Sequence, residues 1–556
     1  MAIKVEALTE KPIAVPDAPA VSGLSERQLQ ILGMLREGKV NKEIANELGI
    51  GLGTVKQHVV ALFKKLNVRN RAMAVSRGAD LLLESRKPLL DHALLEYRPC
   101  VVLSLVLDGS GDSLHGAGRR LQQTMAASAF DHDAIFLARQ QNGGDLIFGI
   151  QGSSEAMVLE ALRAAHQVAQ GTLASDELAG IGLHGGIEAG LAVASMYRSG
   201  GWSGDAIASS AIASARQLAG GSRVGAISLS PAVRGLFRSL CPGSTIGDLP
   251  DVFNFGDLAT VPWHLNQVGS GVGEKQTAIG REQELARVGV LLNGVRRGLG
   301  CTVHIEAETG MGKSAFCDAI VSLVDAAKPA IQWHRIVCQD YDTERIYYDL
   351  ARGIAIPFSD LAAAYRSQAA GVWLFDDCHT LRSEALNELL DLVAEPKKRL
   401  VLLCGRRSAL ISGRVRKSIK LGRLPSSAIR QILQQSGPSI AVQTINDAVR
   451  LAMGVPLFAV ELIQHGSDPL PLSLRLVVGA RLDRLKLDRL LLRQLAEDPA
   501  VWTADQIARQ MHENLATVQA GLERAVASGI VARDDERCYS FSHPLLRQVV
   551  HQAKVE

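Results

Sequence analysis

The sequence lacks the features that would place the chain in a membrane or in an oxidising compartment. No stretch reaches about eighteen consecutive apolar residues, the length that a bilayer span requires. The opening residues, MAIKVEALTEKPIAVPDAPAVSG, show no basic-then-apolar signal pattern. The eight cysteines are scattered, and no pair has the C-x-x-C spacing of a zinc site or a disulfide framework. These absences predict a reduced, cytoplasmic protein with no membrane partner.

Length and composition predict several soluble domains. A chain of 556 residues is too long for one hydrophobic core, and we expect three to five domains. Residues 1–22 are rich in Pro, Ala and acidic side chains, which predicts a disordered tail. The net charge of +3 is small, but between Leu24 and Val75 nine Lys or Arg residues face four Asp or Glu residues, a local balance of +5.

The strongest motif follows a short β-branched run at 302–305. The segment AETGMGKS supplies glycines for close backbone approach to phosphates, a lysine for their outer oxygens and a hydroxyl for Mg²⁺. It departs from the strict P-loop pattern by beginning with Ala307 where Gly is usual. The residues predicted to bind the nucleotide here are Ala307, Thr309, Gly310, Met311, Gly312, Lys313 and Ser314.

A second motif supports the first. The apolar run GVWLF leads directly into Asp376 and Asp377, and a strand that ends in Asp can place a carboxylate beside the Mg²⁺ of a bound nucleotide. Asp377 could orient the attacking water. Taken alone, the pair would sooner indicate acids that cap a helix after a core strand. The order and spacing of the two motifs favour a nucleotide site that binds ATP or ADP with Mg²⁺, held by Ser314 and Asp376.

Residues 23–80 predict a small all-α head. Ser25 followed by Gln28 forms a capping box, and Leu29, Ile31, Leu32 and Leu35 supply an apolar face. Two further helices, from 41 to 48 and from about 54 onward, flank a Gly-containing turn, which is typical of a helix-turn-helix. A solvated basic helix of an ordinary bundle is the alternative.

The stretch LSERQLQILGMLREGKVNKEIANELGIGLGTVKQHVVALFKKLNVRNRAMAV resembles the LuxR-type DNA-binding domain over its whole length. It departs at Gly51, where that family usually has a capping Ser. The resemblance implies binding to a double-stranded DNA operator, and the small size of one such head implies a homodimer or higher oligomer. The residues that it places on DNA are Thr54, Lys56, Gln57, Lys64 and Lys65.

Residues 81–97 are predicted to be a helical linker to an α+β domain at 98–262. The expected order is a strand at 101–107, a helix, a hairpin with its turn at 142–145, a helix at 155–170 and a strand at 181–189. A helix at 205–219 and a strand at 226–229 follow. The first six elements have the β-α-β-β-α-β order of a ferredoxin-like fold.

This domain resembles the class III adenylate/guanylate cyclases in three segments, GGDLIFGI, GLHGGIEAG and GDAIASSAIASARQLAGGSRVGAISLS. The resemblance implies that Asp108 and Asp145 hold metal ions, while turn acids without metal are the alternative. The Asn and Arg that this family places four residues apart are not both present, because Arg216 aligns with the Arg and Ile212 then stands in place of the Asn. We therefore expect a degenerate cyclase relative that serves for dimerisation or ligand sensing; a live cyclase is the alternative.

The carboxyl-terminal half resembles the STAND branch of the AAA-related ATPases. The resemblance rests on Gly280-Arg281-Glu282, the two motifs above, a strand that ends near Arg406, and Gly454-Val455-Pro456. It implies that Arg406 senses the γ-phosphate, that Pro456 sits at the adenine, and that His543 contacts the β-phosphate of ADP. A solvated strand end for Arg406 and a satisfied core or cap histidine for His543 are the alternatives.

Together these features predict a multidomain transcription regulator. The expected parts are a flexible linker at 263–278, an α/β P-loop core at 279–420, a helical lid at 421–470 and a winged-helix-like end at 471–556. Slow ATP hydrolysis would act as a timer, and a small molecule or protein would act as inducer. The rival function is a nucleotidyl cyclase that the other domains regulate.

Overall fold

The computed structural model describes most of the chain after residue 93. Tertiary contacts divide the chain into two compact units, Met1–Asp91 and His92–Glu556. The described residues are 31–35, 39–41, 44, 55, 58–60, 62–63 and 94–555, except 110–111, 140–141, 174–180, 241–248, 259–277, 309, 328–329, 341–344, 350–353, 369, 382, 407, 436–439, 467–469 and 498–501.

The described residues of the first unit are helical except for 39 and 40, and they supply a small apolar core. Of the predicted apolar face, Ile31, Leu32 and Leu35 are described and buried. The apolar side chains of the following segments are buried as well; they are Ile44, Val55, Val59 and Leu62. This burial confirms the predicted apolar faces of the head. The five residues predicted to contact DNA, Thr54, Lys56, Gln57, Lys64 and Lys65, lie outside the described residues.

The second unit begins with a six-stranded sheet whose strand order is β2-β3-β1-β4-β5-β6. Strand β1 pairs antiparallel with both β3 and β4. Strands β1 to β4 of this sheet therefore have the ferredoxin-like pairing that the predicted element order implies. The elements are β1 (Leu94–Asp108), α5 (Asp112–Asp131), β2 (Ile135–Ala138), β3 (Gly143–Phe148), α6 (Met157–Leu173), β4 (Gly182–Met196), α7 (Ser210–Gly221), β5 (Ala226–Leu229), α8 (Pro231–Leu240), β6 (Val252–Asn254) and α9 (Phe255–Leu258).

Helices cover both faces of this sheet. Helices α5 and α6 contribute Leu121, Met125 and Leu162 to the same core as Leu103 and Leu105 of β1. Helix α7 lies on strand β4: a Cβ at Gly186 would come within 2.5 Å of the backbone nitrogen of Ala219. Only glycine allows so close an approach of helix to strand.

Two local predictions for this domain were wrong. The predicted helical linker extends to residue 97, but Leu94–Arg98 already belongs to β1, because these residues pair with Ala192–Met196 of β4. The predicted turn at 142–145 is also displaced. Gly143–Phe148 is strand β3, and Asp145 lies opposite Ser104 of β1 rather than in a turn.

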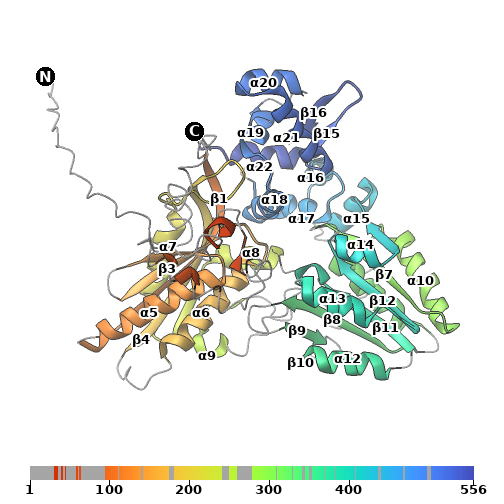
Figure 1. Ribbon diagram of the computed structural model, residues 1–556, viewed down its shortest axis with the longest axis horizontal. Coiled ribbons are helices and arrows are strands. Elements are labelled where there is room, and N and C mark those ends of the chain that lie inside the picture. The colour runs from red at the N-terminus through yellow and green to blue at the C-terminus, as the bar shows by residue number, and fades with distance from the viewer. Residues whose placement is uncertain are drawn as a thin grey trace. The chain divides into compact units, whose positions relative to one another are not determined.

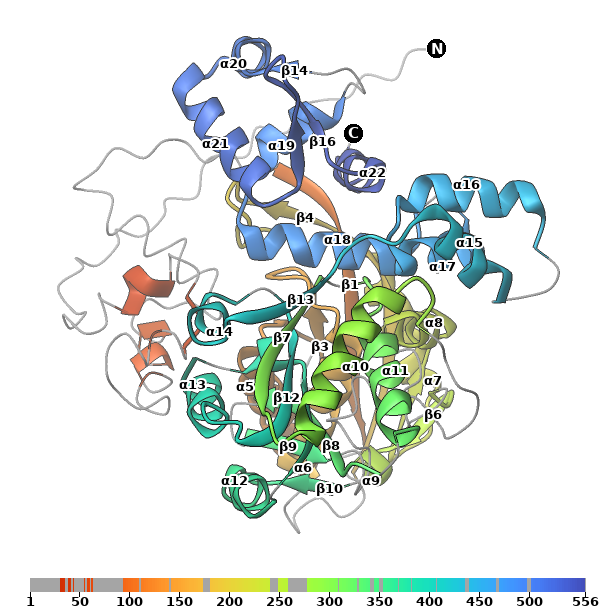
Figure 2. The ribbon, with the colours of Figure 1, turned by 90° about the vertical axis from the view of Figure 1, so that its right-hand side faces the viewer.

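A seven-stranded sheet follows, with strand order β10-β9-β8-β11-β12-β7-β13 (Figure 2). Strands β8, β11, β12, β7 and β13 pair parallel to one another, as strands linked by helical crossovers do. The elements are α10 (Glu282–Arg296), β7 (Cys301–Ala307), α11 (Lys313–Asp325), β8 (Trp333–Asp340), β9 (Arg345–Asp349), β10 (Ile354–Ile356), α12 (Phe358–Ser367), β11 (Ala370–Asp376), η2 (Cys378–Thr380), α13 (Ser383–Leu392), β12 (Lys398–Gly405), α14 (Ala409–Arg414) and β13 (Lys417–Leu421).

Alternating side chains of the central strands divide this domain into two cores. Val303, Leu374 and Leu402 pack with α10 and α11 on one face of the sheet. Phe375 and Leu403 pack with α12 and α13 on the other. The central strands β11 and β12 are therefore buried on both faces, as in a layered α/β domain (Figure 1).

The carboxyl-terminal region is mainly helical and ends in a small three-stranded sheet, β14-β16-β15. Leu421, predicted to begin a helix, instead ends strand β13, because it pairs with Ala307 of β7. The elements are α15 (Ser426–Gln435), α16 (Val442–Ala452), α17 (Pro456–His465), α18 (Leu472–Leu485), α19 (Arg489–Glu497), β14 (Trp502–Thr503), α20 (Ala504–Met511), α21 (Leu515–Ala527), β15 (Val531–Arg533), β16 (Cys538–Phe541) and α22 (Pro544–Gln552).

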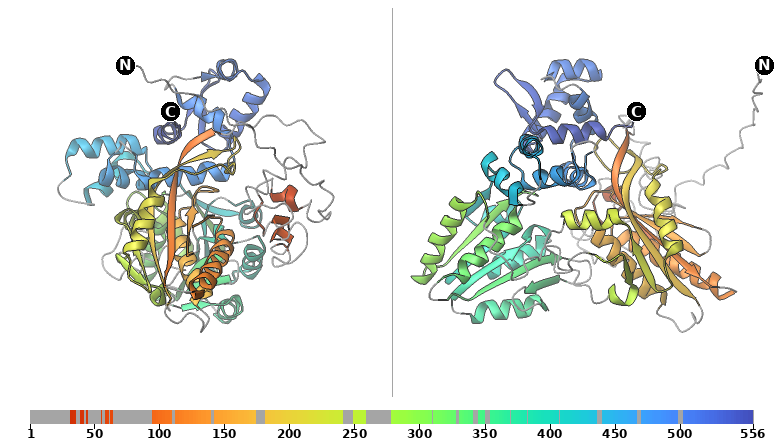
Figure 3. Two further views of the ribbon diagram at one scale, coloured as in Figure 1. Left: turned by 90° about the vertical axis from the view of Figure 1, so that its left-hand side faces the viewer. Right: turned by 180° about the vertical axis from the view of Figure 1, so that it is seen from behind.

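The start of β1 extends beyond its own sheet to these last helices (Figure 3). The backbone nitrogen of Tyr97 donates to the carbonyl oxygen of Ala553, 2.8 Å away, and Glu96 forms an isolated bridge with Lys554. In the part of the chain that the structure describes, no helix is both long enough and apolar enough to cross a bilayer.

Candidate functional site

The P-loop segment links strand β7 to helix α11. Gly312 has φ 81° and precedes Lys313, the first residue of α11, so backbone N–H groups of the first helical turn point toward the loop. Gly310, also at φ 81°, accepts a hydrogen bond at its carbonyl from the backbone nitrogen of Leu457, 3.2 Å away. This bond connects the loop to the residue after Pro456, the first residue of α17. Thr309 lies outside the described residues.

The structure brings the two predicted motifs together. Strand β12 lies between β7 and β11, and the carboxyl ends of these parallel strands meet at one edge of the sheet. There the Lys313 ammonium donates to Asp377 and lies 3.5 Å from Oδ1 of Asp376. The lysine and both acids that were predicted from separate motifs therefore form one cluster.

Asp376 is fully buried and paired with two cations. Its Oδ2 accepts from Arg335 of β8 at 2.9 Å, and Arg335 also pairs with Asp318 of α11. Burial by itself would raise the pKa of Asp376, but Lys313 and Arg335 hold the pKa below its ordinary value. The carboxylate is therefore ionised at neutral pH, the form that can bind a cation.

Asp377 adopts the left-handed conformation, with φ 56°. Its Oδ1 lies 3.6 Å from Nδ1 of His379 in the short helix η2. Burial, together with the positive charges of Lys313 and Arg406, lowers the pKa of His379 to about 2. His379 is therefore neutral at pH 7 and adds no positive charge to the site.

A cleft opens beside the P-loop, between the α/β sheet domain and the last helices. His543 lies at the wall of this cleft as the N-cap of α22: its Nδ1 accepts from Leu545 N at 3.1 Å, so its Nε2 carries the proton toward the Ala452 carbonyl at 3.0 Å. Burial lowers the pKa of His543, which favours this neutral form. The cleft is lined by Glu308, Met311, Arg423, Val455, Phe458, Val477, Val478, Arg481, Arg484, His543 and Leu546.

Two arginines shape the site without having been predicted as site residues. Arg335 balances the negative charge of Asp376 through their ion pair. Arg281 is 4% exposed and donates to the carbonyl oxygens of Met311 at 3.0 Å and Gly422 at 2.6 Å. Arg281 thereby fixes the P-loop to the end of β13. An arginine directly before the apolar run Ile336-Val337-Cys338 was the one signal in the sequence that could have indicated Arg335.

Arg406, predicted to sense a γ-phosphate, follows strand β12 and donates to Oε1 of Glu155 at 2.8 Å. Arg484 of α18 lies 3.6 Å from the same oxygen. The predicted sensor is therefore held by a carboxylate from the first domain of the second unit, and is not a solvated strand end.

The predicted metal ligands of the first domain do not come together. Asp145 is fully buried, and its Oδ2 accepts from Arg216 of α7 at 2.7 and 2.9 Å while Arg139 lies 3.7 Å from Oδ1. Asp108 is exposed and stands four residues beyond Ser104, the partner of Asp145, which is roughly 13 Å along the strand. Among the described residues, no group of three or more His, Cys, Asp or Glu is arranged to hold a metal ion.

The amino-terminal head is the part of the chain whose relatives are clear. Residues 22–77 match the family described as "Bacterial regulatory proteins, luxR family". This match confirms the LuxR-type resemblance of the head. A 78-residue stretch of the chain is also similar to the HTH-type transcriptional regulator MalT of Vibrio cholerae, at 38% identity, and to MalT of Vibrio campbellii, at 37%. These matches span 14% of this chain and 8% of the length of those proteins.

Solved structures show weaker likenesses to parts of the chain. A RuvB mutant of Thermotoga maritima is 17% identical with a TM-score of 0.28, covering 47% of this chain and 93% of that one. The adenylyl cyclase CyaB from P. aeruginosa is 14% identical with a TM-score of 0.23, covering 28% and 92%. At these scores the likenesses decide neither fold nor function.

Proposed function

We propose that the chain is a DNA-binding transcriptional regulator whose assembly and operator binding are switched by ATP and ADP in its α/β domain. One observation carries the switch: the Lys313 ammonium lies between Asp376 and Asp377, at the edge where the P-loop and the acidic strand end meet. The luxR-family match of the head supports the DNA-binding half.

The site has donors for both a triphosphate and Mg²⁺. Lys313 would exchange its carboxylate partners for phosphate oxygens, and the loop residues Ala307, Thr309, Gly310, Met311 and Gly312 would present backbone N–H groups. Ser314 and Asp376 supply the hard oxygen ligands that Mg²⁺ prefers, and bound Mg²⁺ would neutralise charge on the phosphates. Asp377, released from Lys313, would orient the attacking water in a slow hydrolysis.

The helices across the cleft make the site sensitive to which nucleotide is bound. Pro456 begins α17 next to the P-loop, and His543 caps α22 at the wall of the same cleft. The Nε2 proton of His543 could leave the Ala452 carbonyl and donate to the β-phosphate of ADP. A nucleotide that binds two arrangements of these helices unequally shifts the balance between them, and one that binds them equally shifts nothing.

The first domain of the second unit serves best as a dimerisation or ligand-sensing module. Arg216 occupies the Asp145 carboxylate that a cyclase would offer to metal ions. No geometry in the described residues favours the rival function, a live cyclase. A homodimer or higher oligomer would bring two heads, each with Thr54, Lys56, Gln57, Lys64 and Lys65, to one operator. The inducer would be a small molecule or protein.

The test measures DNA binding by the full chain in three nucleotide states. A pool of random duplexes is enriched on the protein, and fluorescence anisotropy then gives the affinity for the enriched duplex without nucleotide, with ADP, and with a slowly hydrolysed ATP analogue. We expect different affinities with ADP and with the analogue, and sedimentation should show a different oligomer. Equal affinity in all three states would refute the switch. Lys56→Ala should weaken binding in every state.

A further inference from the structure

Glu155 joins three separate parts of the second unit. It precedes α6 in the first domain, and its carboxylate contacts Arg406 after β12 at 2.8 Å and Arg484 of α18 at 3.6 Å. Glu155 is 24% exposed and Arg406 is 18% exposed, so this contact is largely screened from water. One carboxylate thus lies between two guanidinium groups that the chain positions independently.

Arg406 and Arg484 together form an anion-binding position beside the candidate nucleotide site. Arg484 lines the same cleft as Met311 of the P-loop and His543. Burial lowers the pKa of Arg484, and the nearby Arg406 lowers it further, whereas Glu155 raises it. Two cations brought this close are stabilised by a shared anion, and in this structure the anion is Glu155.

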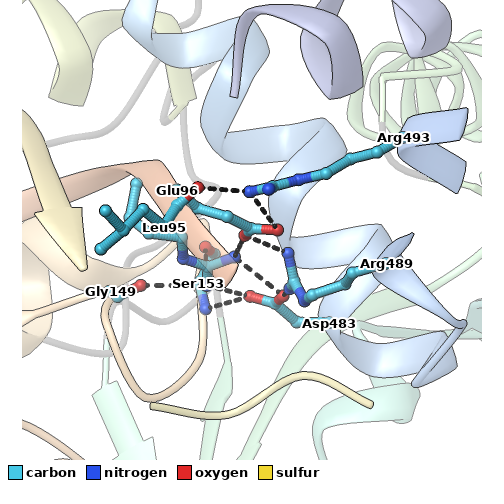
Figure 4. Close-up of polar contacts among 8 residues, drawn as sticks. Leu95, Glu96, Gly149, Ser153, Asp483, Arg489 and Arg493 are labelled. Atoms are coloured by element: carbon cyan, nitrogen blue, oxygen red, sulfur yellow. Dashed lines mark hydrogen bonds and ion pairs between the residues drawn. The ribbon is translucent and has the colours of Figure 1, made fainter. Parts of the chain in front are cut away.

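The loop that carries Glu155 is held in place by buried polar contacts (Figure 4). Arg98 of β1 donates to the Gly149 carbonyl at 3.2 Å and to Oγ of Ser153 at 3.0 Å. Asp483 of α18 accepts from the backbone nitrogen of Ser153 at 2.8 Å and from Arg98 at 3.0 Å. Asp483 and Arg484 are neighbours in α18, so one residue holds the loop and the next contacts its glutamate.

Arg98 and Asp483, which hold this loop and are here called its anchor, belong to a larger cluster of ion pairs. Arg489 of α19 pairs with Asp483 and with Glu96, the latter at 2.5 Å, and Arg493 lies 3.3 Å from Glu96. Burial alone would raise the pKa of Asp483, but Arg98 and Arg489 hold the pKa at about 2. The anchor therefore keeps its charge throughout the neutral pH range, and the loop is positioned independently of any nucleotide.

We propose that Glu155 stands in for the γ-phosphate of ATP, holding Arg406 and Arg484 until a triphosphate displaces it. The inference rests on the proposed function, because it requires a nucleotide in the P-loop. ADP has no γ-phosphate and leaves the glutamate in place. ATP offers those arginines a more highly charged oxygen anion and displaces the Glu155 carboxylate from them. The first domain thereby opposes ATP binding specifically, and ATP binding weakens its hold on α18.

The test compares affinities of the full chain for fluorescent ADP and for a fluorescent, slowly hydrolysed ATP analogue. Glu155→Gln removes the competing charge with little change in size, and we expect about fivefold tighter binding of the ATP analogue, with ADP affinity unchanged within about twofold. Arg484→Gln should lower affinity for the ATP analogue alone. Asp483→Asn, which loosens the loop, should shift the ATP analogue in the same direction as Glu155→Gln.

The matched control is Glu523→Gln, which removes a carboxylate 2.6 Å from Arg533 in the carboxyl-terminal region. It should change neither affinity. Equal shifts for ADP and the ATP analogue in Glu155→Gln, or no shift in either, would overturn the role of Glu155 while leaving the nucleotide site intact. A wild-type chain that binds neither nucleotide would instead refute the proposed function and this inference with it.

Discussion

Replacement of Lys313 by Met tests the nucleotide site most directly. The Lys313 side chain is 11% exposed, and its ammonium is the cation that joins the P-loop helix to Asp376 and Asp377. Methionine keeps the length and apolar stem of the side chain and removes its charge. Phosphate oxygens would then meet two carboxylates without the lysine between them, so both lost attraction and added repulsion weaken binding.

The expected magnitude follows from the bonds that are lost. A charge-assisted hydrogen bond contributes about 1.5–3 kcal/mol, and in the free protein Lys313 must first leave its carboxylate partners, which offsets part of the gain on binding. A net loss of about 2 kcal/mol corresponds to roughly thirtyfold weaker ATP binding. The pKa of Asp376 should also rise, because Arg335 alone would remain to offset its burial.

Fluorescence titration with an ATP analogue measures the loss, and thermal unfolding checks it independently. A ligand at about a hundred times its dissociation constant adds about 2.7 kcal/mol of stability, so ATP should raise the unfolding temperature of the wild type far more than that of the variant. The control is Lys420→Met, on the neighbouring strand β13, whose side chain is 75% exposed and 3.9 Å from Glu306. Affinity in Lys313→Met within threefold of the wild type would refute the assignment.

Three further predictions address other parts of the second unit. His543→Ala removes the cap of α22 and should weaken ADP binding more than ATP binding in titrations; equal losses would contradict the β-phosphate role. Burial raises the pKa of Glu160 to about 7, above its unfolded value, so the free energy of unfolding should fall as pH rises from about 5 to 7. Glu160→Gln should flatten this trend in thermal unfolding, and an unchanged slope would contradict the role of Glu160. Incubation with ATP or GTP and Mn²⁺ should yield no cyclic nucleotide, because Arg216 occupies Asp145; measurable product would restore the cyclase function.

Local signals in the sequence predicted the elements around the candidate nucleotide site well. The strand before the P-loop and the strand that ends at Asp376 both occur where the sequence indicated them, and helix α11 follows the glycines of the P-loop at Lys313. Each is specified by neighbours in sequence: a β-branched run, glycines at positive φ, or an apolar stretch that ends in an acid. The apolar face of the head was predictable for the same reason.

Residues whose roles depend on distant partners were not predictable. The segment Leu94–Arg98 contains good helix formers, yet it is a strand because it pairs with β4 about a hundred residues later. Arg335 contacts Asp376 across 41 positions in the chain, and Arg406 contacts Glu155 across 251. No periodicity or motif in a single sequence records such pairs. His543 shows both cases, since its cap role is local but its contact with Ala452 is not.

The paired strands β1 and β4, each of fifteen residues, form a ribbon roughly 50 Å long. One end lies within a packed sheet and the other is tied to Ala553 and Lys554. A slip of one residue would turn every side chain to the opposite face, so the ladder resists sliding. A rotation of the last helices would therefore be transmitted to the first sheet as a twist of the β1–β4 ribbon, because the ladder cannot slide.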